Sequence, residues 1–383
     1  MQNIKNSTLD KACLYLTVLG IFFFIYSKIW THCAELGTHP IIVDIATAFF
    51  LCSLFLKFVV SFNQIVEGAF KNIILWIVLF VASVLYYLFS GSADMIYGAL
   101  IGFVLQKDKP YELVRSTGYI ALIFFIIQLV GFKMGFFYDL NVWTRTDDAF
   151  LVRKVREAIG YSHPNHATAY FSPVLIAAAY ESPGLRKVFF TVITLIGYID
   201  IYFLTGNRAL FILLIAFLCE PLLRKLFKSN VSMFLSCVAY PFFCLISVCI
   251  AYIAPSPIGH VLNKLLSSRP EIWHSYICSG SVSAFGSSSL ANYLMNDLNQ
   301  PLDNSYIYIL ISAGWVFTLV LCVWFAVFLR QACDQNNESL WVIVVITLVY
   351  WLSESRFSIG VTVFYPLLFS FVLSNNSLED NKF

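Results

Sequence analysis

Charged residues are scarce in this sequence. Of 383 residues only 12% are charged and 59% are hydrophobic, whereas about 25% of the residues of an ordinary soluble domain are charged. A soluble protein of this length would need a charged surface around two or three domains, and this composition does not provide one. The scarcity of charge therefore favours a chain whose outer surface contacts lipid.

Motifs for several common chemistries are also missing. The 10 cysteines show no Cys-x-x-Cys or Cys/His spacing of the kind that binds zinc. The lack of Walker A, Gly-x-Ser-x-Gly and His-Glu-x-x-His motifs argues against a nucleotide-driven pump and a serine or zinc protease. Nucleic acid is not expected as a partner, because the net charge is only +2 and no basic run exceeds three residues. We expect neither a metal nor an organic cofactor.

The hydrophobic residues occur in blocks of about 15 to 24, a length suited to helices that cross a bilayer core about 30 Å thick. Strands of a membrane barrel would be shorter and would alternate in polarity. We therefore predict an all-α, polytopic transmembrane helical bundle of about 12 spans, forming a single integral membrane domain over residues 1–383. The predicted spans lie near 12–30, 41–60, 73–89, 94–105, 117–132, 167–180, 188–204, 209–223, 231–254, 305–329, 341–353 and 361–374.

Basic residues in short loops predict the orientation, because Lys and Arg are retained on the cytoplasmic side. They fall in alternate loops, which we assign to the cytoplasm together with both termini. These residues are Lys107, Lys109, Arg115, Arg186, Lys187, Arg224, Lys225, Lys228 and Arg330. Two longer segments, at about 133–166 and 255–304, are then predicted to be extracytoplasmic loops.

The first of these loops contains a basic stretch that we predict to be a helix lying on the membrane surface. Leu151, Val152, Val155, Ala158 and Ile159 recur at helical spacing, and Arg153, Lys154 and Arg156 occupy the other face. Arg153 and Arg156 are suited to a phosphate group, either of a substrate or of an anionic lipid.

The basic stretch is followed by Ser-His-Pro-Asn-His at 162–166. On one interpretation the proline and asparagine form a turn that starts the next helix. On the other, His163, Asn165 and His166 offer neutral donors and acceptors to a sugar.

Two further groups contain arginines on the predicted outer side. The tight turn Thr-Gly-Asn-Arg at 205–208 places Arg208 at a helix start, where the helix terminus itself favours an anion. Arg269 and Glu271 open the stretch Arg-Pro-Glu-Ile-Trp, which His274 follows. An Arg–Glu pair in a solvated loop is commonly structural and weak, so this second group has two interpretations.

The last group is Leu-Asp-Asn-Ser-Tyr at 302–306, which opens the tenth predicted span. Asp303 or Asn304 can be a simple helix N-cap, or Asp303, Asn304 and Tyr306 can contact substrate. Glu354 lies between the last two predicted spans, where it can form a turn pair with the arginine two residues later.

Over about residues 145–360 the chain resembles the O-antigen polymerase and ligase superfamily. The resemblance lies in the order of these short motifs and in their common position on the predicted outer side of the membrane. The resemblance rests on Asn207-Arg208, on Arg269 to Trp273, on Asp303 to Tyr306 followed by Gly314, and on the His-Pro-Asn at 163–165. Ligases of the superfamily typically have a histidine where this chain has Asp303, which favours a polymerase of O-antigen, capsule or exopolysaccharide.

The resemblance implies a metal-independent glycosyltransferase in the bacterial inner membrane. It would transfer a growing glycan from undecaprenyl pyrophosphate to a lipid-linked oligosaccharide repeat unit on the extracytoplasmic face. A chain-length regulator and a flippase are further candidate partners besides the lipid bilayer.

Particular residues are expected to carry this reaction. Arg208, Arg269 and one of Arg153 or Arg156 are candidates to stabilise the departing pyrophosphate. Asp303 is the first candidate for the base, with His163 or His274 behind it. The remaining candidates for substrate binding are Asn165, His166, Glu271, Asn304, Tyr306 and Glu354.

Two alternatives remain at this point. An O-antigen ligase would transfer finished glycan to lipid A core, and a lipid-linked oligosaccharide flippase or other transporter would catalyse no transfer. Transporters usually place charges near the membrane midplane. Asp44, Lys57 and Glu220 are charges within predicted spans that keep the transporter alternative open.

Overall fold

The structure is a computed structural model of the whole chain. It describes residues 2–33, 41–63, 65–66, 73–90, 94–106, 108–139, 143–147, 152–161, 163–181, 183–206, 209–229, 231–266, 269–278, 282–287 and 302–352. These residues form 15 helices and one two-stranded sheet. The chain folds as two compact units: unit 1 comprises Met1–Gly68 and Val104–Phe211, and unit 2 comprises Ala69–Phe103 and Ile212–Phe383. This division does not test the prediction of a single membrane domain.

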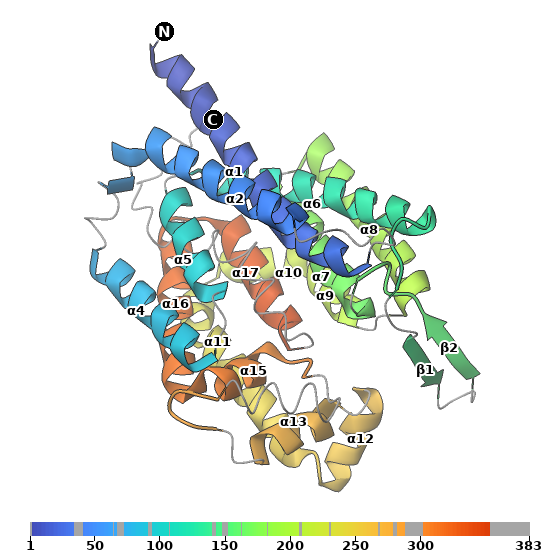
Figure 1. Cartoon of the computed structure of the whole chain (residues 1–383). Coiled ribbons are helices and arrows are strands. Elements are labelled where there is room, and N and C mark those ends of the chain that lie inside the picture. The colour runs from blue at the N-terminus through green and yellow to red at the C-terminus, as the bar shows by residue number, and fades with distance from the viewer. Residues whose placement is uncertain are drawn as a thin grey trace. The chain divides into compact units, whose positions relative to one another are not determined.

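Unit 1 is built from long helices and a hairpin (Figure 1). Its elements are α1 (Gln2–Cys33), α2 (Ile41–Val60), α6 (Pro110–Lys133), β1 (Trp143–Asp147), β2 (Val152–Arg156), α7 (Pro164–Tyr180) and α8 (Leu185–Thr205). Helix α1 packs along α2 and α6, and α7 packs against both α6 and α8. The approach of α1 to α2 is close at Gly20, where an added Cβ would lie 2.7 Å from the Ser53 Oγ.

Unit 2 is organised around α11 (Val231–Ile253), which packs against α10, α12, α13, α15, α16 and α17. The other elements are α4 (Ile73–Ser90), α10 (Glu220–Phe227), α12 (Pro257–Leu265), α13 (Arg269–Cys278), α15 (Ser305–Ser312), α16 (Gly314–Asp334) and α17 (Glu338–Tyr350). Two helices, α5 (Asp94–Leu105) and α9 (Ala209–Leu218), run across the boundaries between the units along the chain.

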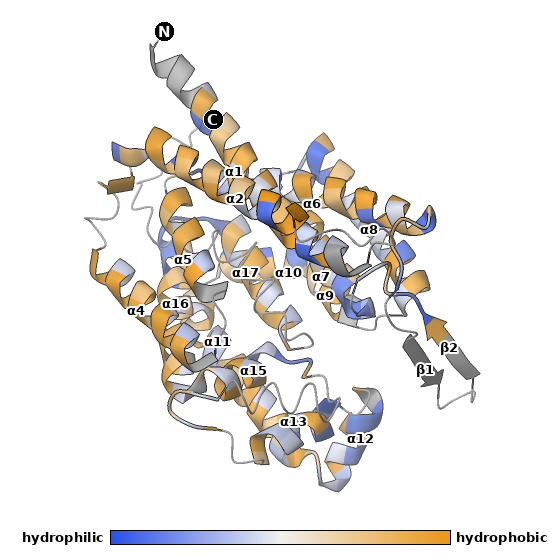
Figure 2. Ribbon diagram, viewed as in Figure 1, coloured by the Kyte–Doolittle hydropathy of each residue, from blue (hydrophilic) through white to orange (hydrophobic). Residues whose placement is uncertain are grey.

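The chain is a multi-pass membrane protein, but the part of it that the structure describes has fewer spans than the predicted 12. Over the described residues six helices are long and apolar enough to cross a membrane, and Figure 2 shows the hydrophobic colouring along them. They are Thr8–Trp30, Ile41–Val60, Pro110–Lys133, Leu185–Thr205, Val231–Ile253 and Gly314–Asp334. Three shorter apolar helices are Trp76–Leu88, Ile96–Leu105 and Glu338–Tyr350. The predicted span 361–374 lies outside the described residues.

One reason for the lower count is that some apolar blocks are covered by protein. The predicted span 167–180 belongs to α7, which has 17 residues, nearly all of them buried. The predicted span 341–353 belongs to α17, which has 13 residues and is buried on most of its surface. A helix that is hydrophobic all round has the same composition whether lipid or protein covers it, so composition alone overcounts spans.

A second reason is a helix break inside the predicted span 305–329. The break between α15 and α16 lies at Gly314, which has a φ of +83°. The segment 282–287 fills it: the N–H groups of Trp315 and Val316 donate to backbone carbonyls of that segment, each at 3.1 Å. These bonds satisfy donors at the start of α16 that have no partner within the helix. The predicted span 209–223 is likewise divided into α9 and α10.

The prediction of a surface helix over 151–159 is wrong. Residues Val152–Arg156 form β2, which pairs antiparallel with β1, so that Val155 lies opposite Thr144. Valine and threonine favour strands because their branched side chains suit a pleated surface. Val152 and Val155 lie in this strand and Ala158 and Ile159 lie after it, whereas Leu151 is outside the described residues.

Candidate functional site

The stretch His-Pro-Asn-His begins α7 in unit 1. His163 is the N-cap, and its Nδ1 accepts a hydrogen bond from the Asn165 backbone N–H at 3.1 Å, while Pro164 occupies the first turn. Asn165 and His166 are 5% and 7% exposed. The interpretation as a helix start is therefore confirmed, and contact with a sugar stays a prediction for all three polar residues.

Arg156 connects this helix start to the end of α8. Its Nη2 donates to the Asn165 Oδ1 at 3.1 Å, and its Nε donates to the carbonyl oxygen of Thr205. Helix α8 ends there because Gly206 adopts a left-handed conformation with a φ of +58°. The structure thus brings together the His163–His166 stretch, Arg156 and the turn that begins at Thr205.

The chain before α7 is fixed by a carboxylate that sequence reasoning missed. Asp139 accepts hydrogen bonds from the backbone N–H groups of Ala158 and Gly160, both at 2.7 Å. Between them Ile159 has a φ of +56°, which is an outlier for a β-branched residue. Gln128 adds a bond to the Ile159 carbonyl at 2.9 Å. Strained backbone of this kind tends to cluster at functional sites, and here it lies four residues before His163.

The side chains of three predicted site residues lie outside the part of the chain that the structure describes. Arg208 and Glu354 lie outside the described residues, and of Arg153 only its position in β2 is described. Their roles stay predictions.

In unit 2, Arg269 and Asp303 form an ion pair. The Arg269 Nη2 donates to the Asp303 Oδ2 at 3.0 Å, and the side chains are 18% and 19% exposed. Arg269 is the first residue of α13, and Asp303 lies two residues before α15. The geometry therefore joins two of the four predicted catalytic residues, and it pairs Arg269 with Asp303 rather than with Glu271, its partner in the structural interpretation.

Tyr276 lies in α13 beside this pair. Burial raises the pKa of its phenol, and the negative charge of Asp303 raises it further. The phenol group therefore stays protonated at physiological pH. No motif in the sequence singled it out.

Glu271 and His274 face different neighbours. The Glu271 backbone N–H donates to the Asn263 Oδ1 at 3.0 Å, which ties α13 to α12. The His274 Nδ1 lies 3.0 Å from the Ala251 carbonyl oxygen, and its Nε2 lies 3.5 Å from the Cys278 Sγ. The contact with Ala251 links His274 to α11, so its role as a reserve base remains a prediction.

Asn304 and Tyr306 have structural partners. Asn304 is the N-cap of α15, as one sequence interpretation expected, and its Nδ2 donates to the Ser247 Oγ and to the Leu352 carbonyl. The Tyr306 hydroxyl donates to the Leu348 carbonyl at 2.6 Å. These bonds tie α15 to its surroundings and position Asp303, which directly precedes Asn304.

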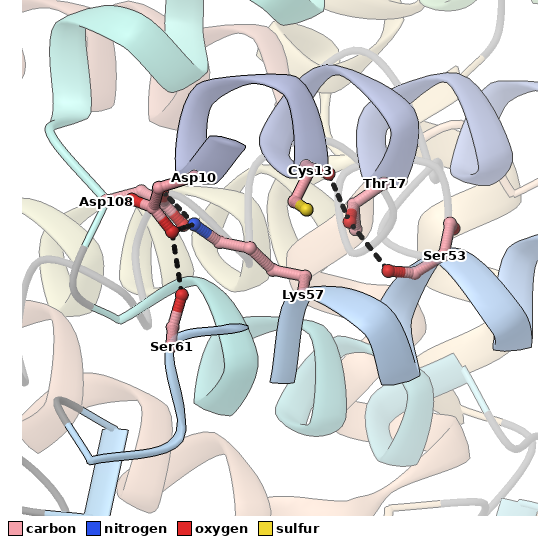
Figure 3. Close-up of polar contacts among 7 residues, drawn as sticks. All are labelled: Asp10, Cys13, Thr17, Ser53, Lys57, Ser61 and Asp108. Atoms are coloured by element: carbon pink, nitrogen blue, oxygen red, sulfur yellow. Dashed lines mark hydrogen bonds and ion pairs between the residues drawn. The ribbon is translucent and has the colours of Figure 1, made fainter. Parts of the chain in front are cut away.

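Most of the charged residues that kept the transporter alternative open form ion pairs. Lys57 contacts Asp10 and Asp108 (Figure 3). Glu220 accepts from the Arg224 Nε at 2.6 Å, one helical turn away. Asp44 is exposed in the first turn of α2, where a helix N-terminus favours negative charge.

The arrangement in unit 2 provides a guanidinium and a protonated phenol on α13 and a carboxylate just before α15. Such a set suits proton transfer and the stabilisation of an anion. Among the described side chains no group of three His, Cys, Asp or Glu residues is arranged to hold a metal ion. No protein-family model matches the chain, and no curated protein matches it.

Proposed function

We propose that this chain is a glycosyltransferase that polymerises lipid-linked oligosaccharide repeat units on the outer face of the bacterial inner membrane. The observation that carries the proposal is the ion pair between Arg269 and Asp303, which lie 34 positions apart in the sequence and 3.0 Å apart in space. Both were selected for one reaction on the basis of their motifs, and their contact is what a shared role in that reaction requires.

In the proposed step, the hydroxyl oxygen of the acceptor sugar bonds to the anomeric carbon of the donor glycan. The bond from that carbon to the diphosphate oxygen breaks, and Asp303 takes the hydroxyl proton. Protonation of Asp303 removes the negative charge beside Arg269 as negative charge develops on the diphosphate. The guanidinium then becomes available to the leaving group, where it is most needed.

The surroundings of the pair support this coupling. Each of the two side chains is less than one-fifth exposed, and charges act more strongly on each other where water is partly excluded. The buried N-cap Asn304 holds the backbone next to Asp303. Preorganised charges of this kind cost little reorganisation during reaction.

The group in unit 1 is assigned to substrate binding. Arg156 is held by two acceptors, so its position is fixed, and Asn165 lies against it. Arg208, Arg153, His163, His166 and Glu354 keep the roles that the resemblance implies for them.

The two alternatives, a ligase and a transporter, are affected differently by the contacts in the structure. An O-antigen ligase would use the same pair, so only its acceptor distinguishes it. The transporter alternative depended on Asp44, Lys57 and Glu220, and ion pairs account for the last two.

The test is a polymerisation assay with purified protein in lipid vesicles supplied with undecaprenyl-pyrophosphate-linked repeat units. We expect Arg269→Ala and Asp303→Asn each to lower the rate of chain growth, measured on gels, by about 10²- to 10³-fold, because each removes a group that stabilises developing charge. The matched controls are Arg330→Ala and Asp334→Asn, which alter an exposed pair 3.9 Å apart and should leave the rate unchanged.

Chain growth at the wild-type rate by correctly inserted Arg269→Ala protein would overturn the proposal. Wild-type protein that joins glycan to lipid A core without extending it would identify a ligase. Movement of the lipid-linked substrate across the vesicle without bond formation would identify a transporter.

A further inference from the structure

A buried lysine joins three segments of unit 1, at a place remote in sequence from every residue assigned to the proposed reaction. Lys57 lies in the last turn of α2 and is 1% exposed. Its Nζ donates to the Asp10 Oδ1 of α1 at 2.7 Å and to the Asp108 Oδ1, just before α6, at 2.6 Å. Figure 3 shows the ammonium between the two carboxylates. A charge buried this deeply requires partners of opposite sign.

The charges of this cluster do not balance. One ammonium faces two carboxylates, so with all three groups ionised the net charge is −1. The Asp10 Oδ1 gains a further donor in the Ser61 hydroxyl at 2.8 Å, and the Asp10 side chain is 36% exposed. The Asp108 side chain is only 5% exposed.

The two oxygens of Asp108 differ in their surroundings. Oδ1 accepts from Lys57, whereas Oδ2 is buried and has no hydrogen-bond partner in the described structure. An ionised carboxylate with one buried oxygen left unsolvated costs free energy. A proton on Oδ2 removes the excess charge, and a neutral carboxylic acid costs less free energy to bury than an ionised carboxylate.

We propose that Asp10, Lys57 and Asp108 form a proton-binding site, in which one proton enters at the Asp108 Oδ2 and brings the cluster to zero net charge. The proton forms an O–H bond at Oδ2, and Oδ1 continues to accept from Lys57. The site controls how firmly the ends of α1 and α2 hold the chain that leads into α6.

The groups around Asp108 support titration in the physiological range. From α1 they are Asp10, Lys11 and Cys13, from α2 Lys57, and from α6 Glu112, which pairs with Lys11 at 2.9 Å. Burial raises the pKa of Asp108 to about 7, with Asp10 and Glu112 adding to the increase and Lys57 opposing it. At a pH near this value both protonation states are populated.

The sign of the effect on stability follows from the raised pKa. The folded chain binds this proton more tightly than the unfolded chain, whose Asp108 has the ordinary pKa of 3.8. The resulting stabilisation is complete below about pH 4 and is lost as the pH rises through about 7.

An infrared titration of the full-length protein in lipid vesicles, from about pH 5 to about pH 9, tests the site directly. We expect the C=O stretch of a protonated carboxylic acid to disappear with a midpoint near pH 7. The band should be missing in Asp108→Asn and retained in Asp334→Asn, a matched change of an exposed carboxylate. The thermal unfolding midpoint should fall with rising pH in wild-type protein and lose this dependence in Asp108→Asn.

A wild-type titration without such a band, or a band that survives in Asp108→Asn, would overturn the proposal. Should Asp108→Asn fail to fold, Asp10→Asn provides a second test. It keeps Asp108 and Lys57 and removes one negative charge, so the midpoint should fall by about one pH unit or more. An unchanged midpoint in Asp10→Asn would also reject the site.

Discussion

A single carboxylate, Asp139, determines the backbone conformation ahead of α7. It accepts hydrogen bonds from two buried N–H groups on either side of Ile159, whose positive φ is unfavourable for a β-branched side chain. A residue in such a conformation costs about 1–3 kcal/mol and persists only where its surroundings impose it. Asp139 therefore stabilises the turn at Ile159, four residues before His163.

Replacing Asp139 with alanine should leave the N–H groups of Ala158 and Gly160 without their acceptor. We expect a loss of about 1–3 kcal/mol in the free energy of unfolding, together with faster hydrogen exchange at these two amides. Thermal unfolding and amide exchange in detergent measure the two effects. The control is Asp44→Ala, which removes an exposed carboxylate from the first turn of α2. Unchanged exchange at both amides would show that Asp139 does not hold the turn.

At the scale of single residues, sequence patterns identify residues that lie in distinctive motifs. They miss side chains that form hydrogen bonds to main-chain atoms. The motifs predict both Arg269 and Asp303 as site residues, but they do not predict that the two side chains contact each other. Asp139 and Gln128 bond to main-chain atoms about 20 to 30 positions away, and such bonds require no particular spacing between residue types. The partners depend on how the chain folds back, which local patterns do not contain.

The break between α15 and α16 is a feature of whole elements, because a separate segment of chain fills it. Gly314 has a φ of +83°, and an added Cβ would lie 2.3 Å from the Ala284 carbonyl oxygen. Both the backbone conformation and the space thus require glycine there. Gly135 has a similar φ of +80° with no atom within 4 Å of an added Cβ. A comparison of the two positions therefore separates the effect of backbone strain from that of steric overlap.

Gly314→Ala should destabilise the protein more than Gly135→Ala. Strain alone costs about 1–2 kcal/mol for alanine at a positive φ, and Gly314→Ala must also displace the segment 282–287. Thermal unfolding of both variants measures the difference, and proteolysis should show earlier cleavage of segment 282–287 only in Gly314→Ala. Equal losses in the two variants would mean that this segment does not depend on close contact at Gly314.

The bounds of many apolar helices were predicted closely, but which of them are long enough to span a membrane was not. The helices that match predicted spans closely, such as α2 and α11, expose large apolar side chains. Helix α7 is also mostly apolar but is buried against α6 and α8, and an apolar composition does not distinguish the two surroundings. The β1–β2 hairpin was missed because five apolar positions fitted a helical period by coincidence, while the strand pattern needed the partner strand to be recognised.

For the whole molecule, the predicted orientation depends on basic residues, several of which form ion pairs. Arg115 contacts Glu181 in unit 1 at 2.6 Å, and in unit 2 Arg224 contacts both Glu220 and Glu338. Acidic residues contribute little to the orientation of membrane proteins, so this pairing leaves the argument from Lys and Arg intact. The pairs also link helices within each unit at ends assigned to the same side of the membrane.

The orientation can be tested with single-cysteine variants and a thiol reagent that does not cross membranes. Cys278 is exposed at the end of α13, on the predicted outer side, and Lys228 is 71% exposed after α10, on the predicted cytoplasmic side. In intact spheroplasts we expect labelling of protein that retains only Cys278, and labelling of a Lys228→Cys variant only after permeabilisation. Because Cys278 shares α13 with Arg269, labelling from the cytoplasm would place the Arg269–Asp303 pair on the side opposite to the proposed lipid-linked donor. That result would reject the polymerase and leave the proton-binding site, which requires no particular orientation, to be judged by its own titration.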